Sequence, residues 1–273
     1  MLKKRVFFIL LIGIFLNLSH AEIMKLKDIK IGMEGTGKTI FKGTKIESFR
    51  FKVLGFVEKF SAGKNLIIAE LFSPELEKGG IVSGMSGSPA YIDGKLIGAV
   101  AYGFGFSKKP IGGITPIEDI LKTDSYNRKG YQVNISDIKV DFGKKNIGKI
   151  WNLIERKLSG RIRFSPENQF APIKLISFSK GMSAEATRRL NPIFTPFNQL
   201  KLKSDILKPV KKKFQNIAAA DAAAIPLIRG DFEYSSSGTV THVDGKKIYL
   251  FGHPFFNLGK VAFPLHKAEV ITV

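Results

Sequence analysis

Short runs rich in apolar, aromatic and β-branched residues recur along much of this chain, and residues 49–57 partly alternate with polar ones, as half-buried strands do. Such runs cover residues 49–57, 65–72, 90–92, 96–102, 238–243, 247–251 and 268–273. Asp93-Gly94 and Asp244-Gly245 separate neighbouring runs and have the composition of tight hairpin turns. The pattern therefore predicts a mainly β chain built from short antiparallel strands.

A few segments break the strand pattern. Residues 110–113 are predicted to form a loop, and residues 115–121 a short helix with Thr115 as its cap and a proline in its first turn. Residues 147–158 and 183–191 have helical spacing, which gives the middle of the chain a mixed character. Strands resume only after an alanine-rich stretch.

These elements divide the chain into four predicted segments. Residues 1–21 form a signal peptide, and residues 22–123 form half of a β-barrel. Residues 124–216 are an inserted or connecting α/β region, and residues 217–273 are a β segment. Because the chain ends within an apparent strand, we expect this last segment to be incomplete.

The first 21 residues have the composition of a secretory signal. Lys3-Lys4-Arg5 is a basic start, residues 6–18 are an apolar run, and Ser19-His20-Ala21 has the small residues of a cleavage site. The apolar run is too short to favour a transmembrane span. We expect an exported protein that is periplasmic, extracellular or attached to the cell envelope. An uncleaved segment retained as an anchor is the alternative.

Composition narrows the chemistry. The chain of 273 residues has no cysteine, which excludes disulfides, thiolate zinc sites and a cysteine nucleophile. No histidine–carboxylate spacing suggests a metal site, and no cofactor is expected. The formal net charge of +20 is compatible with an anionic polymer of the envelope as a partner, or with lysines scattered over solvated faces. The signal peptide argues against nucleic acid as a partner.

Residues Gly32–Thr39 match the spacing of a nucleotide-binding P-loop. That motif needs a buried strand before it and a helix after it, so that loop amides and the helix N-terminus surround the phosphates. The residues that follow have a β pattern instead. We therefore expect a glycine-rich turn of a β domain here, and no nucleotide.

The strongest candidate for chemistry is the turn Gly84-Met85-Ser86-Gly87-Ser88-Pro89, which leads directly into the hairpin around Asp93-Gly94. Glycines on both sides of Ser86 allow a sharp bend, so that the amides of Gly84 and Ser86 can point at one spot. Two such donors beside a serine hydroxyl are suited to an oxyanion hole. Ser86 is the candidate nucleophile and Ser88 a packing residue. A purely structural turn is the alternative.

A serine nucleophile needs a base to take its proton. His253 is the best candidate, because it ends a strand in a Gly-His-Pro turn, from which its ring could reach across a cleft. His242 lies within a strand, and His266 lies beside a lysine. The carboxylate that would orient the imidazole is not identified; Asp231 and Asp244 are candidates.

Two segments resemble the peptidase domain of sporulation stage IV protein B (SpoIVB) and its relatives, a trypsin-like family of secreted serine peptidases. They are residues 74–89, continuing over 93–100, and residues 238–245, running on to Phe251-Gly252-His253-Pro254. The resemblance implies Ser86 as nucleophile and His253 as general base.

The chain departs from the family in three ways. The serine precedes the histidine, which implies permuted barrel halves with the middle region inserted between them. Ser73 stands where the family has an acidic residue, and no PDZ-like segment precedes the serine. The resemblance nevertheless implies an exported serine endopeptidase that acts on protein or peptide substrates. The departures leave a catalytically degenerate trypsin-like binding module of the cell envelope as the alternative.

Overall fold

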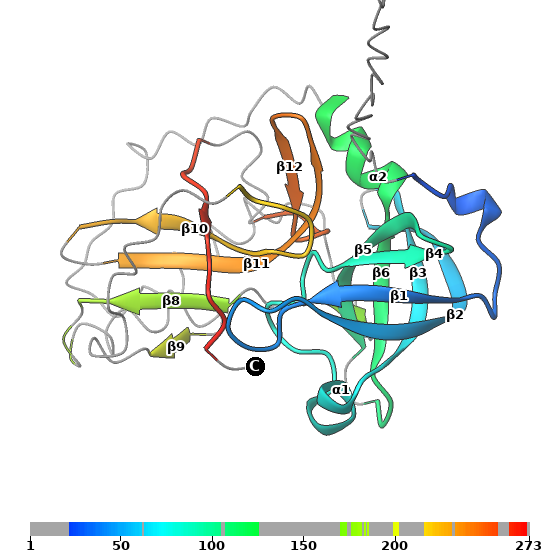
Figure 1. The fold of residues 1–273 in the computed structure, drawn as a ribbon, viewed down its shortest axis with the longest axis horizontal. Coiled ribbons are helices and arrows are strands. Elements are labelled where there is room, and N and C mark those ends of the chain that lie inside the picture. Colours follow the sequence, from blue (N-terminus) through cyan, green and yellow to red (C-terminus); the bar gives the residue numbers. More distant parts are fainter. Residues whose placement is uncertain are drawn as a thin grey trace, which may run out of the picture.

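The computed structural model describes residues 22–61, 63–104, 107–125, 170–173, 176–181, 183, 185, 199–201, 216–230, 233–255 and 262–271. Within these residues the strands form two sheets that lie side by side (Figure 1). One is a closed barrel near the N-terminal end of the described chain, and the other is an open sheet from its C-terminal part. The prediction of a mainly β fold with a trypsin-like antiparallel barrel is confirmed.

Six antiparallel strands make the barrel: β1 (Glu34–Thr39), β2 (Glu47–Ser61), β3 (Lys64–Phe72), β4 (Pro89–Ile92), β5 (Lys95–Phe104) and β6 (Ile111–Pro116). They follow one another in the order β1-β2-β3-β6-β5-β4, and β4 pairs again with β1, which closes the ring. Short helices α1 (Pro74–Gly79) and α2 (Ile117–Leu121) follow β3 and β6, and two 3₁₀ turns cover Leu26–Asp28 and Lys122–Ser125.

Every second side chain along strands β2 and β3 packs into the barrel core. Phe49, Phe51 and Val53 point inward from β2, and Ile67, Ala69 and Leu71 from β3, all at 1% exposure or less. The intervening residues of β2 point outward. This two-residue period is the one expected of strands with one buried face. The predicted strands at 49–57 and 65–72, and the predicted Asp93-Gly94 hairpin between β4 and β5, are therefore confirmed.

The P-loop-like residues form strand β1 rather than the glycine-rich turn that we expected. Gly35 and Gly37 lie opposite Phe51 and Phe49 of β2, and a Cβ on either glycine would overlap the facing aromatic ring. The glycines are thus required by aromatic packing across the strand pair. The loop and helix that a phosphate site of this type needs are replaced here by a barrel strand.

Two element boundaries differ from the prediction. Most of the expected loop at residues 110–113 belongs to β6, where Gly113 packs against Leu66. Thr115 and Pro116 end this strand, so α2 begins only at Ile117. Glycine and proline disfavour strands in general, but the crowded barrel interior selects small residues at these positions.

The second sheet has the order β13-β10-β11-β8-β9, with β12 paired to β11. Its strands are β8 (Ile176–Lys180), β9 (Gln199–Lys201), β10 (Ala222–Ile228), β11 (Glu233–Asp244), β12 (Lys247–Leu250) and β13 (His266–Lys267). The expected strand at 268–273 is reduced to an isolated bridge between Val270 and Gly43 in the part that is described. The remaining short strand, β7 (Phe170–Pro172), is attached to the barrel through β5.

The expected helix at 147–158 lies outside the described residues, as do most of the helix expected at 183–191, the signal peptide and most of the inserted region. None of the helices in the described part has the length and apolar character needed to cross a lipid bilayer.

Candidate active site

The segment before the serine folds around a capped helix. The Ser73 hydroxyl accepts a hydrogen bond from the Leu76 N–H at 3.3 Å and so caps the N-terminus of α1. Ser73, which stands where the resemblance expects an acid, thus has a local structural role. Its side chain is buried beneath the helix that leads to the serine turn.

The serine turn itself depends on left-handed glycines. Gly84 and Gly87 have φ angles of 95° and 99°, a conformation that favours glycine. A Cβ on Gly87 would also overlap the Thr239 carbonyl oxygen. The turn joins β5 through two bonds, Gly87 N–H to the Val100 carbonyl at 2.8 Å and Val100 N–H to the Ser88 carbonyl at 2.9 Å.

Strand β11 of the second sheet holds the other side of the serine turn. The Thr239 hydroxyl donates to the Gly84 carbonyl at 2.7 Å, and the Thr239 N–H donates to the Ser86 carbonyl at 2.8 Å. Two residues on, the Thr241 hydroxyl donates to the Gly87 carbonyl at 2.8 Å. The turn is therefore fixed between the two sheets, by contacts that its own sequence does not reveal.

The turns of Ser86 and His253 meet in space although they are far apart in the chain. The Ser86 hydroxyl is fully buried and donates to the Phe251 carbonyl at 2.7 Å, two residues before the histidine. Phe251 and Gly252 have φ angles of 69° and 67°. A positive φ is unusual for a bulky residue such as Phe251 and stores backbone strain, which clusters at functional sites.

His253 lies in a buried, largely aromatic surrounding. Its ring is 6.3 Å, between centroids, from both the Tyr102 ring of β5 and the Phe251 ring. Nδ1 lies 3.1 Å from the Pro254 carbonyl, which makes Nδ1 the protonated nitrogen of the neutral ring. Nε2 is buried and has no hydrogen-bond partner among the described residues, Ser86 included. The unprotonated nitrogen is therefore available as a base.

Burial lowers the pKa of His253 below its ordinary value of 6.5, because the charged ring is poorly solvated. The carbonyl groups of Pro254 and Ile173 oppose this effect, whereas the ammonium group of Lys64 adds to it. Burial also lowers the pKa of Lys64, against the attraction of Asp119. At neutral pH the His253 imidazole is therefore uncharged.

The amides around Ser86 divide into two groups. Those of Met85, Gly87 and Ser88 donate to backbone carbonyls, whereas those of Gly84 and Ser86 donate to no group within the described residues. The two unpaired donors are the pair expected to form an oxyanion hole. The Ser88 hydroxyl is buried at 0% exposure without a described hydrogen-bond partner, in keeping with a packing residue.

The other candidate residues lie elsewhere. His242 is buried within β11, where it stacks on Tyr249 with ring centroids 6.0 Å apart. Asp244 is exposed at the end of β11, just before the turn to β12, and Asp231 is outside the described residues. No three His, Asp or Glu side chains among the described residues come together as a metal site requires.

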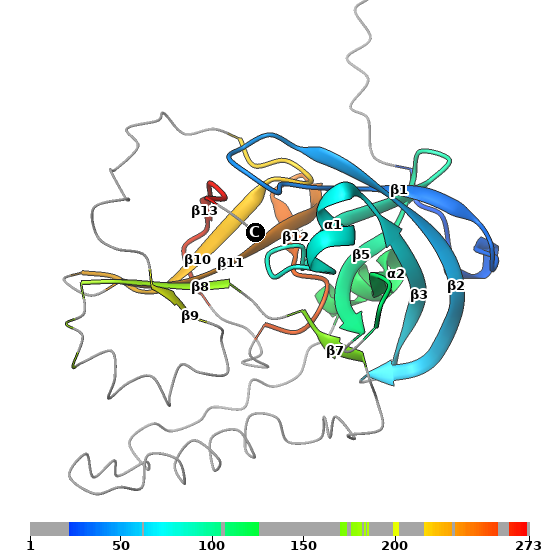
Figure 2. The same ribbon diagram turned by 90° about the horizontal axis from the view of Figure 1, so that it is seen from below.

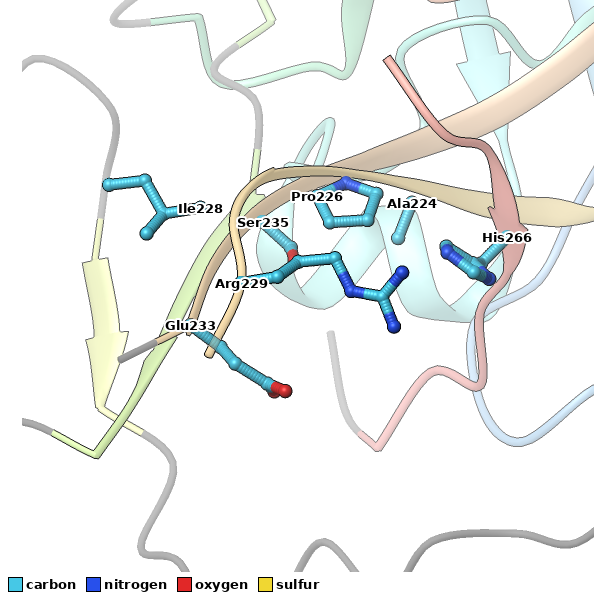
Figure 3. Close-up of a pocket in the computed structure, with 7 residues that line it drawn as sticks. All are labelled: Ala224, Pro226, Ile228, Arg229, Glu233, Ser235 and His266. Atoms are coloured by element: carbon cyan, nitrogen blue, oxygen red, sulfur yellow. The ribbon is translucent and has the colours of Figure 1, made fainter. Parts of the chain in front are cut away.

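His266 belongs to a separate hollow of about 260 Å³ on the second sheet (Figure 3). The hollow is lined by Ala224, Pro226, Ile228, Arg229, Glu233, Ser235 and His266, from β10, β11, β13 and the residue after β10. None of these residues belongs to the serine turn or to the His253 turn.

The geometry agrees with comparisons of the sequence. Residues 16–121 match the family model of the SpoIVB peptidase S55. This segment is similar to the SpoIVB-type peptidases. The SpoIVB-type segment contains the whole barrel and the serine turn, whereas β11 and His253 lie beyond it. Searches of the curated proteins and of the solved structures found no match.

Sequence reasoning missed the groups that join the two turns. The Phe251 carbonyl cannot be identified from residue types, since every residue has a carbonyl. Thr239 and Thr241 left a weak signal, because two threonines at a two-residue period face the same side of a strand. That signal becomes interpretable only once β11 is known to lie against the serine turn of the SpoIVB-type barrel.

Proposed function

We propose that this chain is an exported serine endopeptidase with Ser86 as nucleophile and His253 as general base. The observation that supports it most is the contact of the two turns, with Ser86 bonded to a residue next but one to His253. The unpartnered, uncharged Nε2 of His253 and the free amides of Gly84 and Ser86 supply the other groups that acyl transfer requires.

In the proposed mechanism the Ser86 hydroxyl leaves the Phe251 carbonyl and turns towards Nε2 of His253. As Oγ attacks the carbonyl carbon of a substrate, its proton passes to Nε2. The Gly84 and Ser86 amides donate to the resulting oxyanion. The imidazolium then protonates the leaving amine as the C–N bond breaks, and water hydrolyses the acyl-enzyme by the same steps.

The Pro254 carbonyl takes the position that a carboxylate has in the usual triad. By accepting from Nδ1–H it selects the tautomer in which Nε2 is the base. A neutral carbonyl stabilises the imidazolium less than a carboxylate does, so we expect slower turnover than in a complete triad. Asp231 stays a candidate for the acid.

A non-catalytic binding module of the cell envelope is the second candidate. It is favoured by one observation: Ser86 is fully buried and bonded to a carbonyl rather than to the imidazole. The net charge of +20 would then attract an anionic envelope polymer. Export through residues 1–21 is part of both proposals, as is the absence of nucleic acid and nucleotide partners.

Labelling with a fluorophosphonate probe separates the two functions, because only an activated serine reacts. We expect covalent labelling of the mature chain at Ser86, located by peptide mass mapping, with heat-unfolded protein as the control. Labelling that is equal in folded and unfolded protein, together with no hydrolysis of casein, would leave the binding module as the better proposal.

The pH dependence of activity follows from the environment of His253. Because its pKa is lowered, the base stays unprotonated until the pH falls below about 6.5, so the acid limb of kcat/KM is expected below that value. Stability contributed by the neutral ring is likewise lost as the pH falls below 6.5, since the unfolded chain binds the proton first. The control variant His266→Gln changes an exposed histidine and should show the same acid limb of kcat/KM as the wild type. An acid limb that begins above pH 6.5 would contradict the assignment of His253 as the base.

A further inference from the structure

Strand β7 (Phe170–Pro172) lies beside the C-terminal end of β5, on residues of β5 that are not paired with β4 (Figure 2). The strands are antiparallel, with Tyr102 opposite Pro172, Gly103 opposite Ala171 and Phe104 opposite Phe170. Ile173 continues this register, and its N–H donates to the Ala101 carbonyl at 2.9 Å. An extended piece of the chain is thus added to the barrel outside the ring of six strands.

The position of Ala101 brings this piece of chain to the candidate active site. Its neighbour Val100 makes the two backbone bonds that join β5 to the serine turn. On the other side, a Cβ on Gly252 would lie only 3.0 Å from the Ala101 methyl group, so the His253 turn packs against the same residue. A peptide bonded to the Ala101 carbonyl therefore reaches both turns at once.

The side chain of Ile173 is buried on the serine side. It is 6% exposed and belongs to the same core cluster as Met85, the residue before the nucleophile. Ile81 and Val82, which lead into the serine turn, pack against that cluster. Ala171, two residues earlier in β7, is exposed, as the alternation of a strand requires.

The backbone of Ile173 also reaches the base. Its carbonyl acts on the His253 imidazole and favours the protonated ring. The chain thus presents one carbonyl beside the imidazole and one apolar side chain among the residues before Ser86. A substrate residue that precedes a scissile bond presents the same two groups to a serine peptidase.

We propose that Phe170–Ile173 occupies the substrate groove of this chain as a tethered peptide, with Ile173 at the position that precedes the scissile bond. The inference rests on the proposed peptidase function and deepens it. Extended peptides bind by adding a strand to a sheet edge, with main-chain bonds for affinity and side-chain pockets for specificity. The groove therefore selects peptides with an aliphatic residue before the cleaved bond, and β7 must leave before they enter.

Two matched aspartate substitutions test whether Phe170–Ile173 occupies the substrate groove. Ile173→Asp places a carboxylate in the buried position and should release the strand, whereas Ala171→Asp places the same charge on the exposed face. We expect fluorophosphonate labelling and peptide hydrolysis to be about tenfold faster in Ile173→Asp, since a tethered occupant leaves only a small open fraction. Ala171→Asp should behave like the wild type.

Binding to an inactive variant tests the groove without catalysis. In Ser86→Ala combined with Ile173→Asp, we follow the fluorescence anisotropy of a labelled acetyl-Phe-Ala-Pro-Ile peptide and of its counterpart ending in lysine. The isoleucine peptide should bind at least about tenfold more tightly, because a charged side chain is disfavoured in an apolar pocket.

The outcomes separate the two proposals. Selective binding of the isoleucine peptide with no hydrolysis by any variant would support the groove and overturn the peptidase function. Hydrolysis with equal rates for both aspartate variants, and equal affinity for both peptides, would overturn the tethered peptide alone. If circular dichroism shows that Ile173→Asp does not fold, the wild-type preference for isoleucine over lysine before the cleaved bond decides the question instead.

Discussion

Ser86→Ala is expected to abolish peptide hydrolysis, with a loss of kcat on the order of 10⁶. The substitution removes the oxygen that forms the acyl-enzyme, and no other serine of the turn can replace it. Ser88 is two residues further on, fully buried, and its backbone is bonded to β5. The measurement is the rate of hydrolysis of casein or of a peptide with an aliphatic residue before the cleaved bond.

Ser88→Ala is the matched control, since it makes the same change in the same turn. Its hydroxyl has no described partner, so its removal costs little stability and should leave hydrolysis within a fewfold of the wild type. Ser86→Ala loses one hydrogen bond and leaves the Phe251 carbonyl unpaired, at a cost of about 1–3 kcal/mol. Thermal unfolding shows whether the Ser86→Ala variant is only destabilised by this amount or no longer folds. Equal hydrolysis by Ser86→Ala and the wild type would exclude Ser86 as nucleophile.

The barrel was largely predictable because its strands obey a local rule. The partial alternation of β2, the apolar run of β3 and the Asp-Gly turn between β4 and β5 are visible in the sequence, and side chains at a two-residue period must share a face. Closure of the ring by β4 and β1 is a long-range pairing with no local signal. The glycines of β6 predict a loop in the sequence, because the residues that they pack against, such as Leu66, lie on another strand.

The candidate site was predictable in its residue types and not in its geometry. Ser86 and His253 were identified from turns that suit a nucleophile and a base. That they approach through the Phe251 carbonyl, with Ser86 covered, depends on how β11 and the 251–253 turn lie against the barrel. The strained φ of Phe251 is likewise imposed by tertiary contacts, because a phenylalanine has no local preference for it.

The order of the two site residues along the chain has a simple structural meaning. The serine turn lies between β3 and β4 of the closed barrel, and the histidine follows β12 of the second sheet. Either order of the two sheets along the chain would bring the turns together, provided that β11 lies against the serine turn.

Replacing His253 is expected to be nearly as damaging as replacing Ser86, with a loss of kcat on the order of 10⁶ in His253→Ala where the pair acts as a unit. Without Nε2 the Ser86 proton has no base among the described side chains that contact the turn, and fluorophosphonate labelling should fall with hydrolysis. His266→Ala, in the separate hollow on the second sheet, should leave both rates unchanged. Added imidazole gives a further test, because it can enter the space left by the side chain and accept the proton. Partial recovery of labelling in His253→Ala, and none in Ser86→Ala, is the result that a general base requires; full activity of His253→Ala without imidazole would refute it.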